Sequence, residues 1–347
     1  MNYALSALDM FAVAFGSWRT GLSTPSSDMD FVAMQRSSIM PPGSGSSAVC
    51  HKRGDKVTES QLLEPSLLDP VNTSSMSRRE RSRRFSGALR LVGTHLRSSA
   101  AFCSVQGIPR AKVPIVKALH RGGKRVDVSF LMDGVKSTQF LCEEFKKPQF
   151  SLARGIIILV KALVASWSLG DPSVGGLGSF PISIMVLWFL HAEAARRCPP
   201  EFRKSYAVCL VKFLKYYARE FDYRRTAIDY ANKRLPGKEP TAELCIINPL
   251  NPGSNCAAAA TLFGSRVVPK FDEAYTLFSR LVYTLDDAAV DKALLDTFGG
   301  LIGHTRVQCA QLLGLEKERQ LHGEEAGPQH RWETATSLYA GDPLGDV

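Results

Sequence analysis

The stretch FGSWRTGLSTPSSDMDFV, residues 15–32, decides the fold class of this chain. The apolar segment AVAF (residues 12–15) leads into it, Gly16 and Ser17 follow, and the apolar segment MDFVAM (residues 29–34) leads out of it. Glycine has no Cβ, so a Gly-Ser turn lets backbone N–H groups and a hydroxyl approach phosphate oxygens closely. We therefore predict a strand, a turn suited to phosphate binding, and a second strand.

Two carboxylates follow this turn at a spacing of two residues. Alternate side chains of a strand share a face, so Asp28 and Asp30 point the same way. Asp127 lies in a later alternating segment, KRVDVSFL (residues 124–131), on the face opposite its apolar neighbours. If the two strands are neighbours, three carboxylates converge on one face of a sheet. That face suits Mg²⁺, which prefers oxygen ligands, whereas an Asp-X-Asp pair alone is more often structural.

The rest of the chain divides by composition. Residues 36–76 are rich in Ser, Pro and Gly, and we interpret them as a disordered insertion. A basic helix is expected over about residues 80–97, followed by further extended segments. Residues 136–312 carry apolar positions at helical spacing, and residues 313–347 are predicted to be a flexible tail. The predicted fold class is therefore α+β, with a small mixed-sheet domain over residues 1–135, a mostly helical second domain, and a cleft between them.

Charge is concentrated in one part of the sequence. The 347 residues include 43 Lys and Arg against 33 Asp and Glu, a formal net charge of +10, which favours a polyanionic partner. Between Ser77 and Val126 thirteen residues are basic and one is acidic, a net charge of +12. This density favours nucleic-acid binding through phosphate neutralisation, although a solvated helix face remains an alternative. The run SRRERSRR (residues 77–84) is equally typical of a nuclear import signal.

Several classes of protein are disfavoured by what the sequence lacks. Its eight cysteines include no Cys-X-X-Cys pair, which indicates reduced thiols and an intracellular protein. The longest uncharged apolar run, residues 180–190, is about half of the ~20 residues that a membrane span needs. Asp9 interrupts the apolar N-terminus and no basic residue precedes Arg19, which argues against a secretory signal. Neither a P-loop motif nor a zincin motif is present.

The opening stretch and five later segments of the chain together resemble a known family. The later parts are VPIVKAL and KRVDVSF (residues 113–119 and 124–130), GGLGSFPISIMVLWFL (175–190), FLKYYAREFDYRRTAI (213–228) and INPLNPGSN (247–255). In this order they are similar to the DNA-polymerase-β-type nucleotidyltransferases. The similarity is closest to the non-canonical poly(A) polymerases of the TRAMP type and to their relatives, the terminal uridylyltransferases.

The resemblance implies a fold, a reaction and a cellular setting. A small palm domain would be followed by a helical domain, with the active cleft between them. The reaction would be template-independent transfer of AMP from ATP to RNA 3′-hydroxyl ends, with Mg²⁺ or Mn²⁺. Partners would be RNA 3′ ends and an RNA-binding or exosome-linked protein. The chain is expected in the nucleus, with the cytoplasm as an alternative, and not in a membrane.

The resemblance also implies roles for residues near the opening stretch. Gly16 and Ser17 would bind the phosphates of the incoming nucleotide. Asp28, Asp30 and Asp127 would hold the metal ions. Asp127 would in addition activate the 3′-hydroxyl of the RNA.

The remaining implied residues lie in the helical half. Lys161 and Ser179 would contact the triphosphate, although a lysine that snorkels to the surface remains the alternative for Lys161. Phe180 would stack on the base where the family usually has Tyr. Asn248 and Asn255 would belong to the nucleotide-recognition loop. Asn248 stands where the family usually has Asp, and Cys-Ala-Ala follows the loop in place of Val-Gly-Arg.

Three alternative functions remain open at this point. A terminal uridylyltransferase would share nearly every residue named. A small-molecule nucleotidyltransferase would share the Gly-Ser and Asp-X-Asp motifs, but would need neither the basic stretch nor the INPLNPGSN loop. A non-catalytic RNA-binding scaffold is the third, because the family has helices before its first strand and about nine residues precede it here.

Overall fold

Five strands form one mixed sheet, as the alternating segments predict. They are β1 (Met10–Phe15), β2 (Met29–Gln35), β3 (Phe102–Ile108), β4 (Ile115–His120) and β5 (Arg125–Ser129), in the spatial order β1-β2-β5-β4-β3. β2 pairs with β5 in parallel, and the other three pairings are antiparallel. The predicted α+β class with a small mixed sheet is thereby confirmed.

A computed structural model provides this description. It describes residues 1, 5–6, 8–25, 27–35, 77–111, 113–198, 204–281, 292–293 and 296–297. The predicted insertion (residues 36–76) and tail (residues 313–347) lie outside the described residues.

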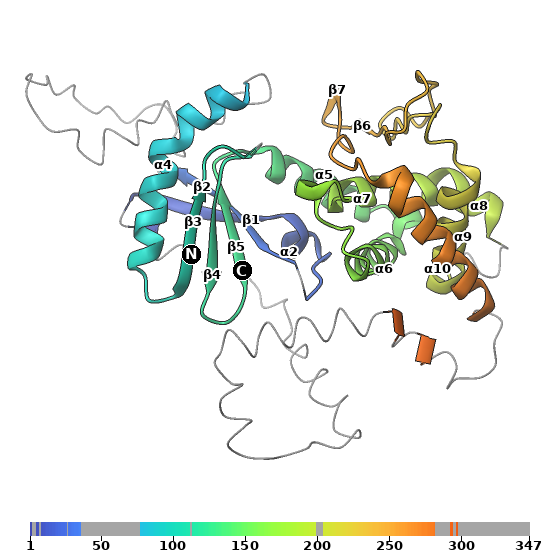
Figure 1. Cartoon of the computed structure of the whole chain (residues 1–347), viewed down its shortest axis with the longest axis horizontal. Coiled ribbons are helices and arrows are strands. Elements are labelled where there is room, and N and C mark those ends of the chain that lie inside the picture. Colours follow the sequence, from blue (N-terminus) through green and yellow to red (C-terminus); the bar gives the residue numbers. More distant parts are fainter. Residues whose placement is uncertain are drawn as a thin grey trace, which may run out of the picture.

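The long basic helix α4 (Arg78–Ser98) covers one face of the sheet (Figure 1). It begins with a capping box, in which the Glu80 N–H donates to Ser77 Oγ (3.3 Å) and the Ser77 N–H donates to Glu80 Oε2 (2.7 Å). Its apolar side recurs at the spacing of one helix face and is buried against the sheet through Phe85, Leu89, Val92 and Leu96. Because α4 occupies this face, the polar side chains of the strands are left on the other one.

The second half of the chain is built mainly from helices. They are α5 (Asp133–Phe145), α6 (Ala153–Ser166), α7 (Ser179–Trp188), α8 (Ala194–Arg197), α9 (Tyr206–Lys215) and α10 (Val268–Leu281). Short 3₁₀ or π turns extend or join them: η4 (Pro148–Phe150), η5 (Pro172–Val174), η6 (Phe189–Glu193), η8 (Tyr216–Glu220) and η9 (Phe263–Val267). Their buried side chains form a core separate from the one beneath α4. Figure 1 shows these helices on the far side of the sheet from α4.

One part of the predicted helical region is not helical. Residues 222–246 form an irregular segment with isolated bridges, such as Thr226 to Gly237. It leads into a hairpin of β6 (Ile247–Asn248) and β7 (Asn251–Asn255). Prolines within and beside the segment account for the difference, because proline lacks the N–H that a helix interior requires.

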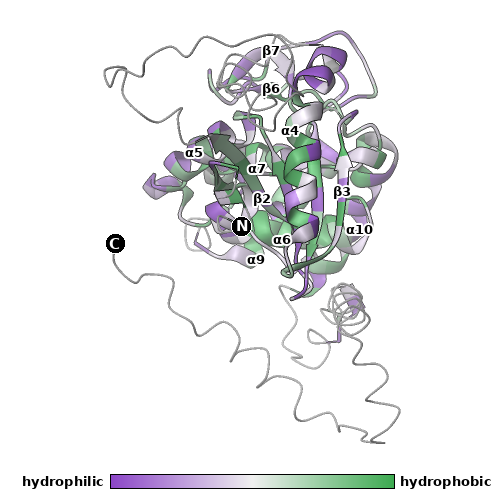
Figure 2. Ribbon diagram, turned by 90° about the vertical axis from the view of Figure 1, so that its left-hand side faces the viewer, coloured by the Kyte–Doolittle hydropathy of each residue, from purple (hydrophilic) through white to green (hydrophobic). Residues whose placement is uncertain are grey.

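Helix α6 is strongly apolar (Figure 2), and with η4 it is long and apolar enough to cross a membrane by length and composition alone. Its side chains are accounted for within the protein, however. Ile156, Ile157, Val160, Leu163 and Val164 are all fully buried in the helical core. Burial on this scale is what a central core helix of a folded domain requires.

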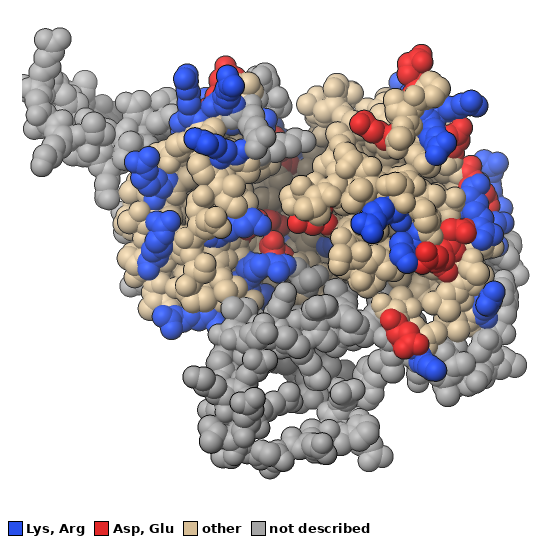
Figure 3. Space-filling view, in the orientation of Figure 1, with Lys and Arg blue, Asp and Glu red and all other residues tan. Residues whose placement is uncertain are grey.

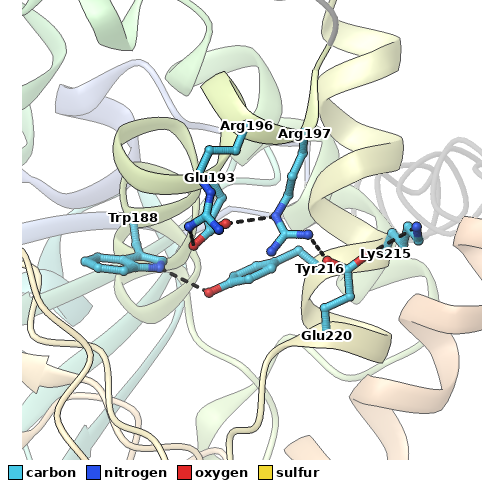
Figure 4. A network of polar contacts seen from close by, with 7 residues as sticks. All are labelled: Trp188, Glu193, Arg196, Arg197, Lys215, Tyr216 and Glu220. Atoms are coloured by element: carbon cyan, nitrogen blue, oxygen red, sulfur yellow. Dashed lines mark hydrogen bonds and ion pairs between the residues drawn. The ribbon is translucent and has the colours of Figure 1, made fainter.

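A network of hydrogen bonds and ion pairs joins elements of the helical half on its side away from the sheet (Figure 4). Arg197 Nε donates to Glu193 Oε2 (2.9 Å), and the guanidinium pairs with Glu220. The same guanidinium lies over the Tyr216 ring, 4.6 Å from its centroid, and Trp188 Nε1 donates to the Tyr216 hydroxyl (3.3 Å). Because Glu193 is buried, this pairing compensates its charge and ties α8 to η8.

Candidate active site

Charged side chains of three neighbouring strands form one row across the sheet. Lys117 of β4 is the register partner of Asp127 of β5, and Asp127 is the register partner of Asp30 of β2. Register partners share a face, and this face is opposite to α4. It is therefore turned toward the helical half (Figure 1). Figure 3 shows a recess between the two halves in which acidic and basic side chains lie close together.

Asp28 lies one position before β2 and is held by an arginine. Arg125 Nε donates to Asp28 Oδ1 at 2.5 Å, while Lys117 Nζ lies 3.7 Å from Asp127 Oδ2. Two of the three predicted metal ligands thus have cationic partners. Among the residues that the structure describes, no group of three or more His, Cys, Asp or Glu side chains is close enough together to hold one metal ion.

The electrostatics of this row fit a divalent cation. Burial, together with the charges of Asp127 and Asp28, raises the pKa of Asp30 from its usual 3.8 to about 7. Burial also raises the pKa of Asp127, although the nearby Lys117 opposes the shift. Neighbouring carboxylates repel one another when they are ionised, and a divalent cation relieves this repulsion. Their oxygen atoms are also the ligands that Mg²⁺ prefers. Asp28, Asp30 and Asp127 are therefore the residues of this face that could hold such an ion.

Gly16 begins the turn that lies against the carboxylates. It opens α2 (Gly16–Thr20) with a positive φ of 71°, and a Cβ at this position would collide with the carboxylate of Asp30. Its N–H donates to Thr138 Oγ1 of α5 at 2.7 Å. In this structure the Gly16 N–H is therefore used within the protein, and the glycine allows the turn to lie directly against Asp30.

Lys161 of α6 is buried and lies beside the same turn. Its Nζ donates to Ser17 Oγ (2.9 Å) and to the carbonyl oxygen of Leu22 (2.6 Å). Burial lowers the pKa of Lys161 to about 8, although the charge of Asp30 opposes the shift. A lysine that snorkels to solvent does not fit this position, because its side chain is only 8% exposed. Lys161 instead joins the helical half to the Gly-Ser turn.

The predicted base-stacking residue begins the apolar helix α7. Ser179 is exposed at the first position of this helix, and Phe180 beside it is half-buried. The Phe180 ring packs edge-on against Phe140 of α5, with centroids 6.4 Å apart, and Phe140 packs edge-on against Tyr230. The Tyr230 hydroxyl donates to buried Glu144 Oε2 at 2.6 Å. A supported aromatic ring of this kind has a fixed orientation.

The two predicted loop asparagines are used to shape their hairpin. Asn255 Oδ1 accepts from the N–H groups of Ile246 (3.0 Å) and Ala257 (2.9 Å), and its Nδ2 donates to the carbonyl of Leu244 (2.9 Å). Asn248 Oδ1 accepts from the Leu250 N–H at 3.0 Å. In this structure the Asn255 amide therefore contacts backbone groups of its own loop.

The basic stretch forms an exposed surface on the sheet half (Figure 3). Its exposed cations in the described part of the chain are Arg79, Arg83, Arg90, Arg97, Arg110, Lys117, Arg121, Lys124 and Arg125. They extend from α4 to the strands beside the carboxylates. Of these cations, Lys117 and Arg125 lie beside the carboxylates of the candidate site.

Three residues of the site, Lys117, Arg125 and Thr138, are not among those predicted from the sequence. Lys117 and Arg125 occupy the same strand face as Asp127, and the period of two in their strands was a signal that could have identified them. Thr138 had no such signal, because its contact with Gly16 joins residues 122 positions apart.

The sheet, the Gly-Ser turn and the three carboxylates have the arrangement expected of a palm domain of the DNA-polymerase-β type. The family model of the central palm domain of the mitochondrial-like poly(A) RNA polymerases matches residues 7–143. The model of the Cid1 family poly A polymerases matches residues 205–253. The resemblance to the non-canonical poly(A) polymerases that the motifs indicate is thereby confirmed.

Individual relatives agree with this assignment. Poly(A) RNA polymerase cid14 of Schizosaccharomyces pombe is 26% identical over 227 residues, 65% of this chain and 27% of that protein. The inactive non-canonical poly(A) RNA polymerase protein Trf4-2 of Drosophila melanogaster is 24% identical over 284 residues, 77% of this chain and 58% of that protein. The polymerase core of TRAMP, an RNA surveillance complex, shares the fold with a TM-score of 0.59 at 20% identity, over 86% of this chain and 84% of that chain. This chain spans about a quarter of the length of the first curated relatives that it matches.

Proposed function

We propose that this protein is a polynucleotide adenylyltransferase that adds AMP from ATP to RNA 3′-hydroxyl ends without a template. The observation that carries the proposal is the register pairing of Asp30 with Asp127 in parallel strands, directly beside the Gly-Ser turn. The intact set of three carboxylates argues against a scaffold, because RNA binding alone does not require them.

The residues of the sheet face have distinct roles in this proposal. Asp28, Asp30 and Asp127 would hold Mg²⁺ or Mn²⁺, and such ions, when bound, stabilise the attacking and leaving oxygens of phosphoryl transfer. Asp127 accepts the proton of the RNA 3′-hydroxyl. The 3′ oxygen forms a bond to the α-phosphorus of ATP, the bond from that phosphorus to the β-phosphate oxygen breaks, and pyrophosphate leaves.

The nucleotide lies between the two halves in this proposal. Ser17 and Ser179 provide hydroxyl groups for the triphosphate. Lys161 has three N–H donors; two are donated to Ser17 and Leu22, and the third contacts a phosphate oxygen. Phe180 stacks on the base, and the hairpin that contains Asn248 and Asn255 sets the preference for ATP over UTP.

RNA binding, partner binding and location complete the proposal. The exposed basic surface binds the RNA backbone through charge. An RNA-binding or exosome-linked protein supplies target choice, in keeping with solved relatives described as the TRAMP polymerase core and a GLD-2/RNP-8 complex. The basic run over residues 77–84 directs the chain to the nucleus, which imaging of the tagged chain with and without these arginines would test.

A 3′-extension assay tests the proposed activity. Purified chain is incubated with a generic RNA, Mg²⁺ and each NTP in turn. Extension with ATP in excess of the other nucleotides supports the proposal, and extension chiefly with UTP would make the protein a terminal uridylyltransferase. RNA binding without extension by any nucleotide would identify a non-catalytic RNA-binding protein.

A further inference from the structure

Tyr230 is a buried residue of the irregular segment that precedes the β6–β7 hairpin, and it is only 1% exposed. Its hydroxyl donates to Glu144 Oε2 of α5 at 2.6 Å, and the other oxygen of that carboxylate pairs with Lys147 Nζ at 2.7 Å. Lys233 Nζ lies 3.1 Å from the centroid of the Tyr230 ring. The Tyr230 side chain is therefore held both at its hydroxyl and at its ring.

The ring of Tyr230 supports the aromatic residue that is proposed to stack on the base. It meets Phe140 of α5 edge-on, with centroids 6.2 Å apart, and Phe140 meets Phe180 edge-on at 6.4 Å. Phe150 packs on the same ring at 6.4 Å. Because aromatic pairs prefer a narrow set of geometries, a fixed Tyr230 restricts the positions open to Phe140 and, through it, to Phe180.

The backbone two residues before Tyr230 supports the hairpin that is proposed to select the base. The Ile228 N–H donates to the carbonyl of Cys245 at 3.0 Å. The N–H of Ile247, the first residue of β6, donates to the carbonyl of Ile228 at 2.9 Å. Ile228 and Ile246 are both fully buried and form a parallel bridge. The position of this segment thus sets the position at which the hairpin begins.

We infer that Tyr230, through its hydrogen bond to Glu144, is a positioning residue that holds the base-stacking ring and the base-selecting hairpin in a fixed relation. This inference rests on the proposed function and adds to it a residue that is too buried to touch the nucleotide itself. Stacking on Phe180 accepts every base. Selection therefore requires that the stacked base lie at a constant distance from the hairpin, and this link provides that constancy.

The hydrogen bond matters because Glu144 is itself buried. Without the Tyr230 hydroxyl, one oxygen of its carboxylate loses its donor in the protein interior, which is costly for a charged group. The carboxylate is then expected to shift toward water and Lys147. Phe140 lies one turn before Glu144 on the same face of α5, so such a shift also moves the ring that supports Phe180.

The first test measures nucleotide affinity without RNA, so that it does not depend on catalysis. ATP and UTP, each with Mg²⁺, are titrated calorimetrically into the full chain and into Tyr230→Phe. The variant is expected to bind both nucleotides about two- to tenfold more weakly and to have an altered ATP-to-UTP affinity ratio. A native ratio in Tyr230→Phe would overturn the inference.

Tyr216→Phe is the matched control for this measurement. It removes another buried tyrosine hydroxyl from the same helical core and deprives Trp188 Nε1 of its acceptor, on the side away from the sheet (Figure 4). It should keep the native affinities and the native ratio. Equal losses of affinity in the two variants would make Tyr230 an ordinary residue of the core and refute a positioning role.

Double variants separate the two elements that Tyr230 is inferred to hold. In a Phe180→Ala background, Tyr230→Phe should no longer weaken ATP and UTP by a common factor, but it should still change their ratio. In an Asn255→Ala background the common loss should remain, and the ratio should not change further. This non-additivity is what shared support requires, and fully additive effects in both backgrounds would contradict it.

Hydrogen–deuterium exchange tests the link in the protein without any nucleotide. The peptide that contains Ile246, Ile247 and the rest of the hairpin should exchange faster in Tyr230→Phe than in the native chain, because its anchoring segment is loosened. Peptides of α9 should exchange at the native rate in that variant. Tyr216→Phe should leave the hairpin at its native rate. Native exchange of the hairpin in Tyr230→Phe would show that Tyr230 does not hold it.

The outcomes separate this inference from the proposed function. If ATP and UTP bind but RNA is not extended, only the proposed activity fails, and the tests of Tyr230 remain decisive. If extension proceeds while Tyr230→Phe keeps the native affinities and ratio, the positioning role alone is wrong. If neither nucleotide binds to the native chain, the proposed function fails, and hydrogen exchange still decides whether Tyr230 holds the hairpin. Circular dichroism and urea unfolding check the folding of each variant.

Discussion

Asp30 and Asp127 lie opposite one another in the parallel pair of strands β2 and β5, although the residues are far apart in sequence. Their carboxylates share a face with Asp28, and burial together with the charges of Asp127 and Asp28 raises the pKa of Asp30 to about 7. The pairing thus brings together the carboxylates proposed to hold the metal ions. Their negative charges repel one another, and a bound cation would relieve that repulsion.

The first prediction concerns the proposed metal ligands. Asp28→Ala/Asp30→Ala should lower RNA extension by ~10²–10⁴-fold, because stabilisation of the transition state by a bound metal contributes several kcal/mol. RNA affinity, measured by fluorescence anisotropy, should remain similar or become tighter. Extension at the native rate by the double variant would show that these carboxylates do not hold the catalytic metals.

The second prediction is a pH dependence of stability in the metal-free protein. The folded-state pKa of Asp30 is raised from 3.8 to about 7, so folding holds its proton more tightly than the unfolded chain does. Ionised Asp30 therefore destabilises the fold progressively as pH rises from about 4 to 7. Asp30→Asn should be more stable than the native chain at pH 8, by up to about 4 kcal/mol, and nearly equal to it at pH 4.5.

Urea unfolding in EDTA at the two pH values measures this difference. Addition of Mg²⁺ at pH 8 should stabilise the native chain more than Asp30→Asn. A stability difference that does not change with pH would show that Asp30 is not strained by its neighbours.

The third prediction concerns the aromatic ring at the start of α7. Phe180→Ala should raise the apparent KM for all four NTPs by a similar factor, roughly five- to a hundredfold, because stacking contributes ~1–3 kcal/mol with little base preference. Phe180→Tyr restores the ring and serves as the matched control. Steady-state extension assays give both constants. A change in the ATP-to-UTP ratio with Phe180→Ala would instead assign base selection to this ring.

The fourth prediction concerns the hairpin asparagine. Asn255→Ala should lower the free energy of unfolding by about 1–3 kcal/mol, because it leaves the N–H groups of Ile246 and Ala257 without their acceptor. It should also change the ATP-to-UTP ratio, since the loop loses its shape. Asn255→Asp keeps the acceptors for both N–H groups and should lose less stability. Native stability together with an altered ratio in Asn255→Ala would point to direct contact with the base.

The fifth prediction concerns the basic surface. Replacing Arg78, Arg79, Arg81, Arg83 and Arg84 with Ala should weaken binding to unrelated RNAs by a similar factor. The slope of log affinity against log salt should become shallower by about 0.7 for each RNA phosphate that these arginines neutralise. Arg224→Ala/Arg225→Ala, on the helical half, is the control and should leave the slope unchanged. Unchanged RNA affinity with loss of nuclear entry would make this run an import signal only.

The sequence by itself determined the strands and their faces. A period of two in DMDFVAM and KRVDVSF assigned Asp28, Asp30 and Asp127 to the polar face, because alternation is a local property of an extended backbone. The spacing of Phe85, Leu89, Val92 and Leu96 likewise determined which side of α4 is buried. The irregular segment at residues 222–246 was missed, although its prolines were visible.

Only the tertiary structure decided which atoms these side chains meet. Lys161 donates to Ser17 across 144 positions, and Arg125 holds Asp28 across 97. The amide of Asn255 is used by its own hairpin, and the Gly16 N–H by α5. Such contacts depend on how two halves of the chain pack together. Local periodicity carries no information about that packing, because a hydrogen bond depends on the distance between its atoms and not on their separation in sequence.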